Sequence, residues 1–264
     1  MHFQVLSSGS GGNASLVRAG GTHLMLDAGL PLKDLEERLQ TARVSLTRIG
    51  HIALTHGHLD HARSAGLLAK KSGARVHCTE SLMRSRSVRK APTVARLPVG
   101  GTVEIPVTAG HEEGEVLLLS SIAIPHDADP TVALQVEHRG RKAVLITDMG
   151  RTSRMVAERL RGAHLLVLEF NHDLEMLQHG PYAAGLKKRV AGPQGHLSND
   201  EGAEMLRLLA GEELHTLVLA HLSETNNTPE RALATARATL EEIGRPDVRV
   251  LVAAQDAVGP NLEV

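Results

Sequence analysis

The sequence predicts an α/β protein in which strands and helices alternate along a single domain. Short apolar runs with the length of buried strands, such as 52–54 and 165–168, are separated by segments with helical periodicity. The 264 residues are 42% hydrophobic and 22% charged, which is ordinary for a globular protein with a sizeable core. No repeat, low-complexity tract or linker divides the chain, so we expect one domain over residues 1–264.

The individual elements follow from local patterning. Strands are expected at 2–8, 14–19, 22–27, 52–54, 74–78, 102–107, 115–124, 131–138, 142–147, 165–168, 214–220 and 248–253. Pro31 is well placed as the first residue of a helix, Ser198 and Glu201 have capping-box spacing, and Thr228-Pro229 starts a late helix. Further helices are expected up to residue 71 and from residue 152, and residues 80–96 are expected to be irregular or helical.

The composition narrows the classes of function. The formal net charge of −1 provides no global field toward nucleic acid or membranes, and no apolar run has the roughly 18 residues of a membrane span. The single cysteine, Cys78, fits a reducing compartment, so a cytoplasmic location is expected. Two Phe, one Tyr and no Trp argue against a function built on stacking bases over aromatic platforms. The 16 histidines point instead toward metal binding.

The densest group of candidate metal ligands is the segment 56–61. His56, His58, Asp60 and His61 lie within six residues and directly follow the predicted strand 52–54. Gly57 gives the backbone freedom, and an extended tip turns alternate side chains the same way. A helix starting near Asp60 would place Asp60 and His61 at its N-terminus. A solvent-exposed polar turn explains this cluster poorly.

Possible ligands also stand at the ends of five predicted strands: His56, His126 with Asp127, Asp148, Glu169 and His221. In α/β proteins, sites are usually built from loops at strand ends. The donors are nitrogen and oxygen only, and they are too many for one tetrahedral ion. We therefore expect two divalent ions, zinc or manganese, with iron also possible. Two such ions can share and activate a water molecule.

The motif Thr-His-Gly-His-Leu-Asp-His, residues 55–61, resembles the histidine-aspartate motif of the metallo-β-lactamase fold. The fold's remaining motifs are matched, in order, by Asp27, His126, Asp148 and His221. More narrowly, the chain resembles the small bacterial YycJ/WalJ-like exonucleases. The segments that carry this likeness are 7–13, 124–127, 168–173, 195–199 and 219–227.

The resemblance implies a four-layer αββα sandwich. Ribonucleases of the J type carry a second domain, the β-CASP insertion, between the bridging aspartate and the last histidine. The 73 positions from Asp148 to His221 are needed for the predicted strands and helices, so we expect no such insertion here. The resemblance also implies metal-dependent 5′→3′ DNA exonuclease activity linked to mismatch repair. One ion would be held by His56, His58 and His126, and the other by Asp60, His61 and His221, with Asp148 bridging. Asp27 would orient the ligand loop as a second-shell residue.

We expect a metal-bridging hydroxide, oriented by Asp60, to attack a phosphodiester phosphorus. His196 is a candidate for phosphate binding or leaving-group protonation, or it is a structural histidine before a helix. His172 is either a second-shell or structural residue or part of the site. Four polar side chains could contact substrate, although the first three could equally satisfy a turn: Ser8, Ser10, Asn13 and Asn226.

Two basic runs could follow a DNA backbone or could simply be solvated: Arg84, Arg86, Arg89 and Lys90, and Lys187-Lys188-Arg189. Three functions remain open. The first is a DNA exonuclease. The second is a small-molecule hydrolase, such as a cyclic-phosphate phosphodiesterase or a glyoxalase II-like thioesterase, which the neutral charge and scarce aromatics favour. The third is a non-enzymatic metal-binding or partner-binding module, against which the full ligand set argues.

Overall fold

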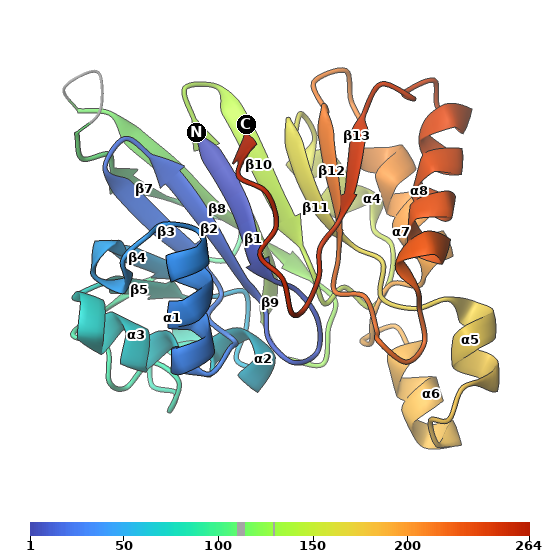
Figure 1. Cartoon of the computed structure of the whole chain (residues 1–264), viewed down its shortest axis with the longest axis horizontal. Helices are drawn as coiled ribbons and strands as arrows, with labels where there is room; N and C mark the ends of the chain where they lie inside the picture. Colours follow the sequence, from blue (N-terminus) through green and yellow to red (C-terminus); the bar gives the residue numbers. More distant parts are fainter. Residues whose placement is uncertain (110–113, 129) are drawn as a thin grey trace.

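Two seven-stranded sheets lie at the centre of the fold in the computed structural model (Figure 1), which describes residues 1–109, 114–128 and 130–264. The first sheet has the order β14-β1-β2-β3-β4-β5-β6. Its strands are β1 (His2–Ser7), β2 (Ala14–Ala19), β3 (Thr22–Leu26), β4 (His51–Ala53), β5 (Arg75–Cys78), β6 (Thr93–Arg96) and β14 (Leu262–Glu263). Neighbours from β14 to β3 are antiparallel, whereas β3 to β6 are parallel.

The second sheet repeats this mixed pattern with the order β13-β12-β11-β10-β9-β8-β7. Its strands are β7 (Thr102–Pro106), β8 (Val116–Ile124), β9 (Thr131–His138), β10 (Arg141–Ile146), β11 (Leu165–Glu169), β12 (Thr216–Ala220) and β13 (Arg249–Val252). Neighbours from β7 to β10 are antiparallel, and β10 to β13 are parallel.

Helices cover the outer face of each sheet. On the first sheet these are α1 (Leu32–Thr41), α2 (Leu59–Ala62) and α3 (Ala65–Ser72), and on the second α4 (Arg154–Leu160), α7 (Asn199–Leu209) and α8 (Pro229–Glu242). Two 3₁₀ turns are η1 (Leu46–Arg48) and η2 (Glu80–Leu82). The short helices α5 (Leu174–His179) and α6 (Ala184–Val190) project beyond the sandwich, and we call residues 174–190 the arm (Figure 1).

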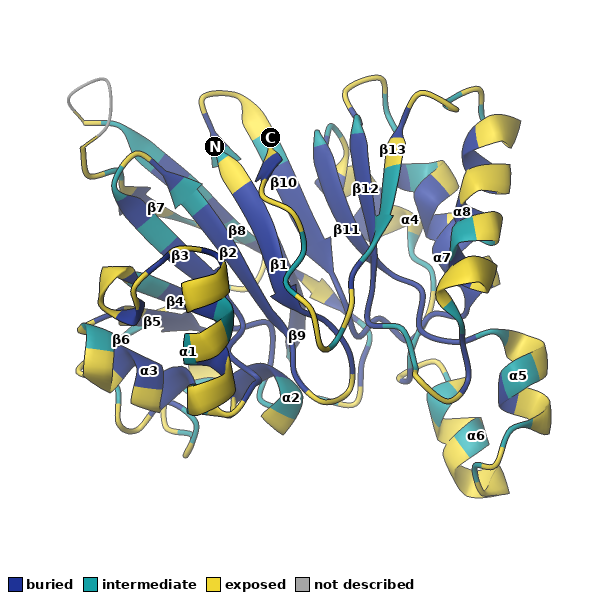
Figure 2. Ribbon diagram, viewed as in Figure 1, coloured by how far each residue is buried: buried dark blue, intermediate teal, exposed yellow. Residues whose placement is uncertain are grey.

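Three buried apolar layers hold these elements together. The layer between the sheets contains Phe3 and Leu24 of the first sheet and Leu119 and Leu134 of the second. The other two layers fill the spaces between each sheet and its own helices. Figure 2 shows the central strands of both sheets and the inner sides of the covering helices as buried, with the edge strands β7 and β13 and the outer helix faces partly or fully exposed. The predicted αββα sandwich, a single domain, is therefore confirmed.

Most predicted elements are present, and the differences have local causes. Pro31 does not begin α1 but precedes it with an extended ψ of 143°. The helix expected up to residue 71 is two helices, α2 and α3, separated at 63–64. Strand β6 lies within a segment expected to be irregular or helical; it is a four-residue edge strand, with two exposed and two partly buried residues, and lacks apolar alternation. The capping box at Ser198 and the helix start at Thr228 are confirmed.

Between Asp148 and His221, a fully described stretch, the chain forms only α4, β11, the arm, α7 and β12. No second domain is inserted there, so the expected absence of a β-CASP insertion is confirmed for this stretch. Within the described part of the chain, no helix has the length and apolar character needed to cross a bilayer.

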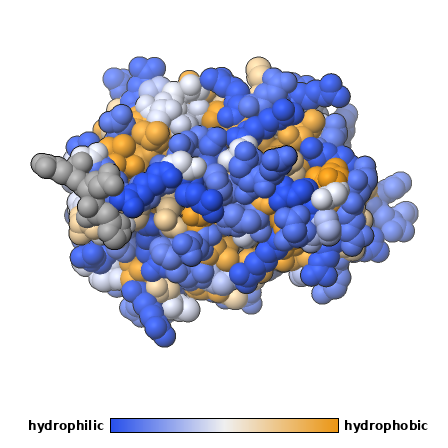
Figure 3. Space-filling model, turned by 90° about the horizontal axis from the view of Figure 1, so that it is seen from above, coloured by the Kyte–Doolittle hydropathy of each residue, from blue (hydrophilic) through white to orange (hydrophobic). Residues whose placement is uncertain are grey.

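One end of the sandwich gathers the loops that follow β3, β4, β8, β10, β11 and β12, at the bottom of Figure 1. This convergence follows from the parallel register of β3 with β4 and of β10 with β11 and β12. The two termini lie at the opposite end, which is mainly hydrophilic with small separate hydrophobic patches when seen from above (Figure 3). The candidate site is therefore sought at the end where these strands finish.

Candidate metal centre

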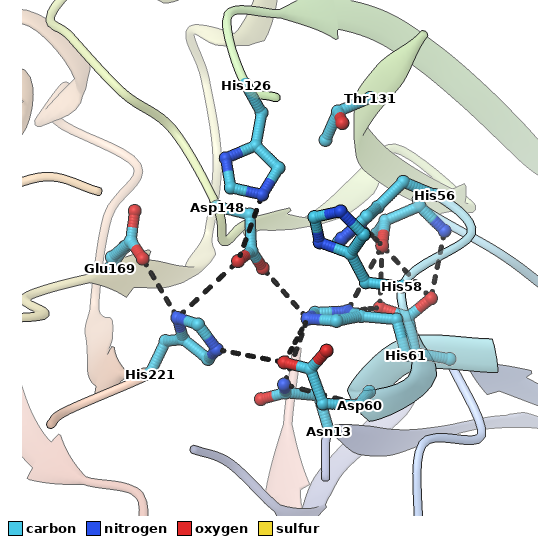
Figure 4. A network of polar contacts seen from close by, with 12 residues as sticks. Asn13, His56, His58, Asp60, His61, His126, Thr131, Asp148, Glu169 and His221 are labelled. Atoms are coloured by element: carbon cyan, nitrogen blue, oxygen red, sulfur yellow. Dashed lines mark hydrogen bonds and ion pairs between the residues drawn. The ribbon is translucent and has the colours of Figure 1, made fainter. Parts of the chain in front are cut away.

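The strand ends turn sharply where the predicted site residues begin. Asp27, Asp148 and His221 have positive φ values of 60°, 58° and 56°, in the left-handed region that non-glycine residues seldom adopt. Such a conformation costs of order 1–3 kcal/mol per residue and persists where the surrounding structure requires it. These residues follow β3, β10 and β12, respectively. The side chains of Asp148 and His221 point into a common centre (Figure 4), and Asp27 lies behind His61.

The segment 56–61 is fixed from behind by backbone contacts. The Asn13 amide donates to the Asp60 carbonyl (2.7 Å), and the Ala28 amide donates to the His61 carbonyl (2.7 Å). A Cβ on Gly29 would lie 1.6 Å from that Asp60 carbonyl oxygen, so only glycine allows this approach. As predicted, Asp60 and His61 lie at the start of a helix, in α2.

The Nδ1 atoms of four histidines are held by protein partners. His61 Nδ1 lies 2.7 Å from Asp27 Oδ2, and His126 Nδ1 lies 3.0 Å from the Gly195 carbonyl oxygen. His56 Nδ1 lies 3.1 Å from Thr55 Oγ1, whose hydroxyl donates to Asp27. A proton on each Nδ1 would direct the Nε2 lone pair toward the centre.

The fourth histidine, His221, is held in the same way by a glutamate. Its Nδ1 lies 2.9 Å from Glu169 Oε1, and the same oxygen lies 2.9 Å from His196 Nδ1. Glu169 Oε2 accepts from the backbone amides of Met149 (2.9 Å) and Leu197 (3.2 Å). Glu169 is fully buried and orients two rings at once. Its position after the strand 165–168 indicated a site residue, but this positioning role depends on a tertiary contact.

The inward nitrogen atoms of His126 and His221 have carboxylates within 4 Å but no hydrogen-bond partner among the described residues. The Nε2 atoms of His56, His126 and His221 are buried and form no hydrogen bond with the described residues. A buried polar atom left in this state is costly, and a divalent cation would satisfy several of them together. Imidazole nitrogen and carboxylate oxygen are donors suited to zinc, manganese or iron. The residues of the centre therefore fit divalent metal ions.

The predicted ligands form two groups, and the ligand atoms of each group lie within 4.8 Å of one another. The first group is His56, His58 and His126, and the second is Asp60, His61 and His221. Asp148 lies between them: its Oδ2 is 2.9 Å from His61 Nε2, and its Oδ1 is 3.7 Å from His126 Nε2. A further group that also satisfies this distance joins Asp148, Glu169, His196 and His221.

Charges in the centre are balanced between imidazoles and carboxylates. Burial, together with the charge of His61, lowers the pKa of His56 to about 2. Burial also opposes the charged form of His221, but the carboxylates of Asp148 and Asp60 raise its pKa to about 10. The pKa of Asp148 lies well below its usual value because His221 and His61 outweigh the effect of burial. Because a histidine must lose its proton to bind metal, metal affinity should fall in acid.

The other candidate residues lie in different places around the centre. Ser8 is buried and its Oγ accepts from the His221 amide (2.8 Å), while Asn13 Nδ2 lies 3.0 Å from His61 Nε2. Ser8 therefore supports a ligand histidine from behind, whereas Asn13 contacts the inward-facing nitrogen of His61. Ser10 and Asn226 instead line the cleft over the centre.

His172 and Asn226 are both fully buried, and their side-chain polar atoms have no hydrogen-bond partner among the described residues. Burial lowers the pKa of His172 to about 4. His172 does not line the cleft, so its side chain lies outside the space that a substrate would occupy. Its predicted role, structural or second-shell, remains untested.

The centre opens into a cleft of about 300 Å³. One side of this cleft is formed by the arm, through Tyr182, Leu186, Arg189 and Val190. This wall was not predicted, because α5 and α6 are short and only one of their residues, Leu177, is buried. Asn171, which also lines the cleft, donates from Nδ2 to the His221 carbonyl (2.8 Å).

The two basic runs differ in their surroundings. Arg84, Arg86, Arg89 and Lys90, which we call the basic segment, are exposed and form no ion pair with any residue the structure describes. The basic segment begins shortly after Leu82. A side-chain atom of Leu82, Cδ2, lies 2.7 Å from the position that a Cβ on Gly57 would take. The basic segment therefore begins beside the ligand loop, residues 56–61. In the arm, Lys187 Nζ donates to the Gln178 carbonyl (2.8 Å) and Arg189 pairs with Asp127 (2.5 Å).

The chain belongs to the metallo-β-lactamase superfamily, whose sequence pattern matches residues 8–221. The family and the histidine–aspartate centre together define a metal-dependent hydrolase, and the expectation of a non-enzymatic module is set aside. The predicted resemblance to this superfamily is confirmed.

Within the superfamily, the relatives include two exodeoxyribonucleases. Exodeoxyribonuclease YycJ of Bacillus anthracis is 32% identical over 244 residues, covering 92% of this chain and 90% of the relative. Exodeoxyribonuclease WalJ of Streptococcus pneumoniae strain D39 is 30% identical over 233 residues, covering 88% and 86%. Ribonuclease Z of Kineococcus radiotolerans is 28% identical over 273 residues, covering 88% and 84%.

Solved structures share the fold at lower sequence identity. The metallo-β-lactamase fold protein YhfI of Bacillus subtilis matches with a TM-score of 0.72 and 16% identity over 99% of both chains. Zinc-bound PqqB of Methylobacterium extorquens matches with a TM-score of 0.70 and 18% identity over the whole of both chains. These likenesses show the common fold.

Proposed function

We propose that this hydrolase is a DNA exonuclease that uses two divalent ions, zinc or manganese, to release mononucleotides from the 5′ end. The observation that carries the proposal is the convergence of inward-facing, buried imidazole Nε2 atoms around the Asp148 carboxylate. The likeness to YycJ and WalJ over most of each chain supports DNA as the substrate. Iron is a further candidate for the metal.

The ligand assignment follows the two groups that the fold brings together. His56, His58 and His126 would hold one ion, and Asp60, His61 and His221 the other. Asp148 would contact both, because its two oxygens face opposite groups. Asp27 would act behind His61 by fixing the proton on Nδ1. Two divalent ions held here would lower the pKa of water and stabilise the charge that develops on phosphate oxygens.

The side chains around the ligands would then orient the attacking water and supply a proton to the leaving oxygen. Asp60, whose side chain is 24% exposed, faces the cleft and would orient the attacking water. Water adds to the phosphorus, the bond from phosphorus to the 3′ oxygen of the terminal nucleotide breaks, and that oxygen takes up a proton. The 3′ end of the remaining DNA is unchanged. The released nucleotide carries a 5′ phosphate only if the DNA end had one before cleavage. Each cleaved phosphate stays on the new 5′ end of the DNA.

His196 would supply that proton. Its ring is anchored through Nδ1 to Glu169 (2.9 Å), and the residue lines the cleft. A carboxylate on Nδ1 stabilises the protonated imidazole, which can then donate from Nε2 to a phosphate oxygen or to the departing 3′ oxygen. Ser10 and Asn226 would donate to substrate oxygens from the cleft walls.

The DNA would approach between the basic segment and the arm. The exposed cations of the basic segment begin beside the ligand loop, and the arm stands across the cleft, where Lys188 is exposed. Cations in these positions would neutralise backbone phosphates without reading sequence. The cytoplasmic location and the link to DNA mismatch repair remain predictions.

The size of the cleft also fits a second candidate, a small-molecule hydrolase acting on a cyclic phosphate or a thioester. Its volume of about 300 Å³ lies at the low end of the range of about 300–1,000 Å³ for small-molecule sites. An exonuclease needs to admit only one terminal nucleotide, so this size fits both candidates. The experiment that separates them must offer both kinds of substrate.

The test uses manganese- or zinc-loaded protein and linear duplex DNA labelled separately at each end. Asp60→Ala, purified in parallel, reports contaminating nucleases, and Asp34→Ala on the exposed face of α1 is the matched control that should keep full activity. Release of the 5′ label in mononucleotides by wild type and Asp34→Ala, but not by Asp60→Ala, is expected.

Two other outcomes would change the proposal. Release of the 3′ label first would reverse the polarity. Intact DNA, with rapid hydrolysis of a cyclic phosphodiester or a thioester, would transfer the assignment to the small-molecule candidate. RNA of the same sequence, offered alongside, tests the activity named for the ribonuclease Z relative.

A further inference from the structure

The chain's aromatic side chains are distributed unevenly between the core and the cleft. The chain has two phenylalanines, one tyrosine and no tryptophan. Both phenylalanines, Phe3 and Phe170, are completely buried in the core. The remaining ring, Tyr182, is half-buried and lines the cleft together with Asp60, Asp148 and His221. The one phenyl-type ring that a ligand can reach therefore faces the metal centre.

Tyr182 belongs to an apolar wall on one face of the arm. Leu186 and Val190 also line the cleft, at steps of four residues that place them on one side of α6. Helix α6 has no buried residue, and Leu186 is 40% exposed. This apolar face is therefore not needed to fill the core, and it remains open toward the cleft.

The arm is fastened in this position by polar contacts. Arg189 Nε and Nη2 lie 2.9 and 2.5 Å from Asp127 Oδ2, next in sequence to His126. The chain leaving α6 reaches Gly195, whose carbonyl oxygen is 3.0 Å from His126 Nδ1. A wall attached in this way keeps a fixed distance from the ligand histidines.

We propose that Tyr182 is a specificity-determining residue, whose ring stacks on the terminal nucleobase of the DNA while Leu186 packs against the edge of that base. The inference rests on the exonuclease function proposed above. Every base has a π-face, so a stacking wall would hold any terminal nucleotide without reading sequence. The base must leave the duplex to reach the wall, so frayed or single-stranded ends should be preferred.

A binding experiment tests the contact without depending on turnover. Because the chain has one tyrosine and no tryptophan, its intrinsic tyrosine fluorescence comes from Tyr182 alone. A short 5′-phosphorylated oligothymidylate, added to metal-loaded His196→Ala protein, which should keep its metal and turn over slowly, should quench this emission in a saturable way. The same oligonucleotide with an abasic 5′ residue should bind with much less quenching.

Two substitutions in that background separate stacking from packing. Tyr182→Ala should weaken oligothymidylate binding by about 5- to 150-fold, the loss expected for one stacked base, and should weaken binding of the abasic oligonucleotide far less. Tyr182→Phe keeps the ring and should restore the affinity, measured by anisotropy of a labelled oligonucleotide. In otherwise wild-type enzyme, Tyr182→Ala should raise KM for DNA more than it lowers kcat.

The inference is overturned if quenching is absent, or if Tyr182→Ala weakens binding of both oligonucleotides equally. A lower unfolding temperature for Tyr182→Ala, with the same affinity for DNA, would show that the ring only supports the arm. These outcomes differ from failure of the proposed function, in which wild-type protein leaves end-labelled DNA intact.

Discussion

The metal centre and the arm face each other across one cleft but are built in opposite ways. In the centre, His56, His61 and Asp148 are almost completely buried, and partners on several strands fix their orientation. In the arm, α6 buries none of its residues and presents Tyr182 and Leu186 to the cleft. We infer that the packed strand ends would set the reaction, whereas the exposed arm beside them would influence the choice of substrate.

The largest loss of activity is expected from Asp148→Asn in the metal centre. Asparagine tolerates the left-handed backbone at this position, so the fold should survive, but the negative charge shared by the two ligand groups is removed. Hydrolysis of DNA and of a small phosphodiester should both fall to background, and metal content measured by mass spectrometry should drop. Retention of both ions with full activity would contradict the bridging role of Asp148.

His196→Ala separates proton transfer from metal binding. Loss of a general acid typically costs about 10²- to 10⁴-fold, so kcat on DNA should fall by that factor while metal content is unchanged. His2→Ala, at the far end of the molecule, is the matched control and should behave as wild type. If His196→Ala loses metal, the group of Asp148, Glu169, His196 and His221 binds an ion, and the proton-donor role fails.

Asp27→Asn tests the support behind the ligands. The carboxylate accepts from Thr55 and His61, and asparagine keeps its shape but not its charge. Metal affinity should fall about 10- to 100-fold, as is typical for such supporting partners, and excess metal should restore activity. The measurement is a metal titration of activity, and a rate that excess metal fails to restore would give Asp27 a different role.

The basic segment should produce the mildest and most salt-dependent effect. Wild-type cleavage of long DNA should fall steeply with salt, whereas hydrolysis of a small phosphodiester should not. Replacing Arg84, Arg86, Arg89 and Lys90 with alanine should reduce the slope of log affinity against log salt by about 0.9 for each phosphate that the variant no longer neutralises. Arg237→Ala, exposed on α8, is the control. An unchanged slope would make the basic segment a solvated surface.

The grouping of the candidate ligands could be predicted because its sequence signals are local. His56, His58, Asp60 and His61 are close in sequence, and each remaining ligand directly follows an apolar strand. The parallel register then brings these strand ends to one edge, where ligands distant in sequence meet.

The arm and the positioning role of Glu169 escaped prediction for physical reasons. Helices α5 and α6 have six and seven residues and no apolar stripe of the length that packing helices show. Glu169 acts by accepting hydrogen bonds from His196 and His221, which are distant in sequence. Likewise, the partners of Ser8 and Asn13 are visible only after the loop 7–13 packs behind His61 and His221.

The most direct test of the two-ion centre is anomalous diffraction at the manganese or zinc edge from crystals of the metal-loaded protein. We predict two peaks, one among His56, His58 and His126 and the other among Asp60, His61 and His221, with Asp148 contacting both. A single peak, or a peak enclosed by Glu169, His196 and His221, would contradict a two-ion centre at the strand ends.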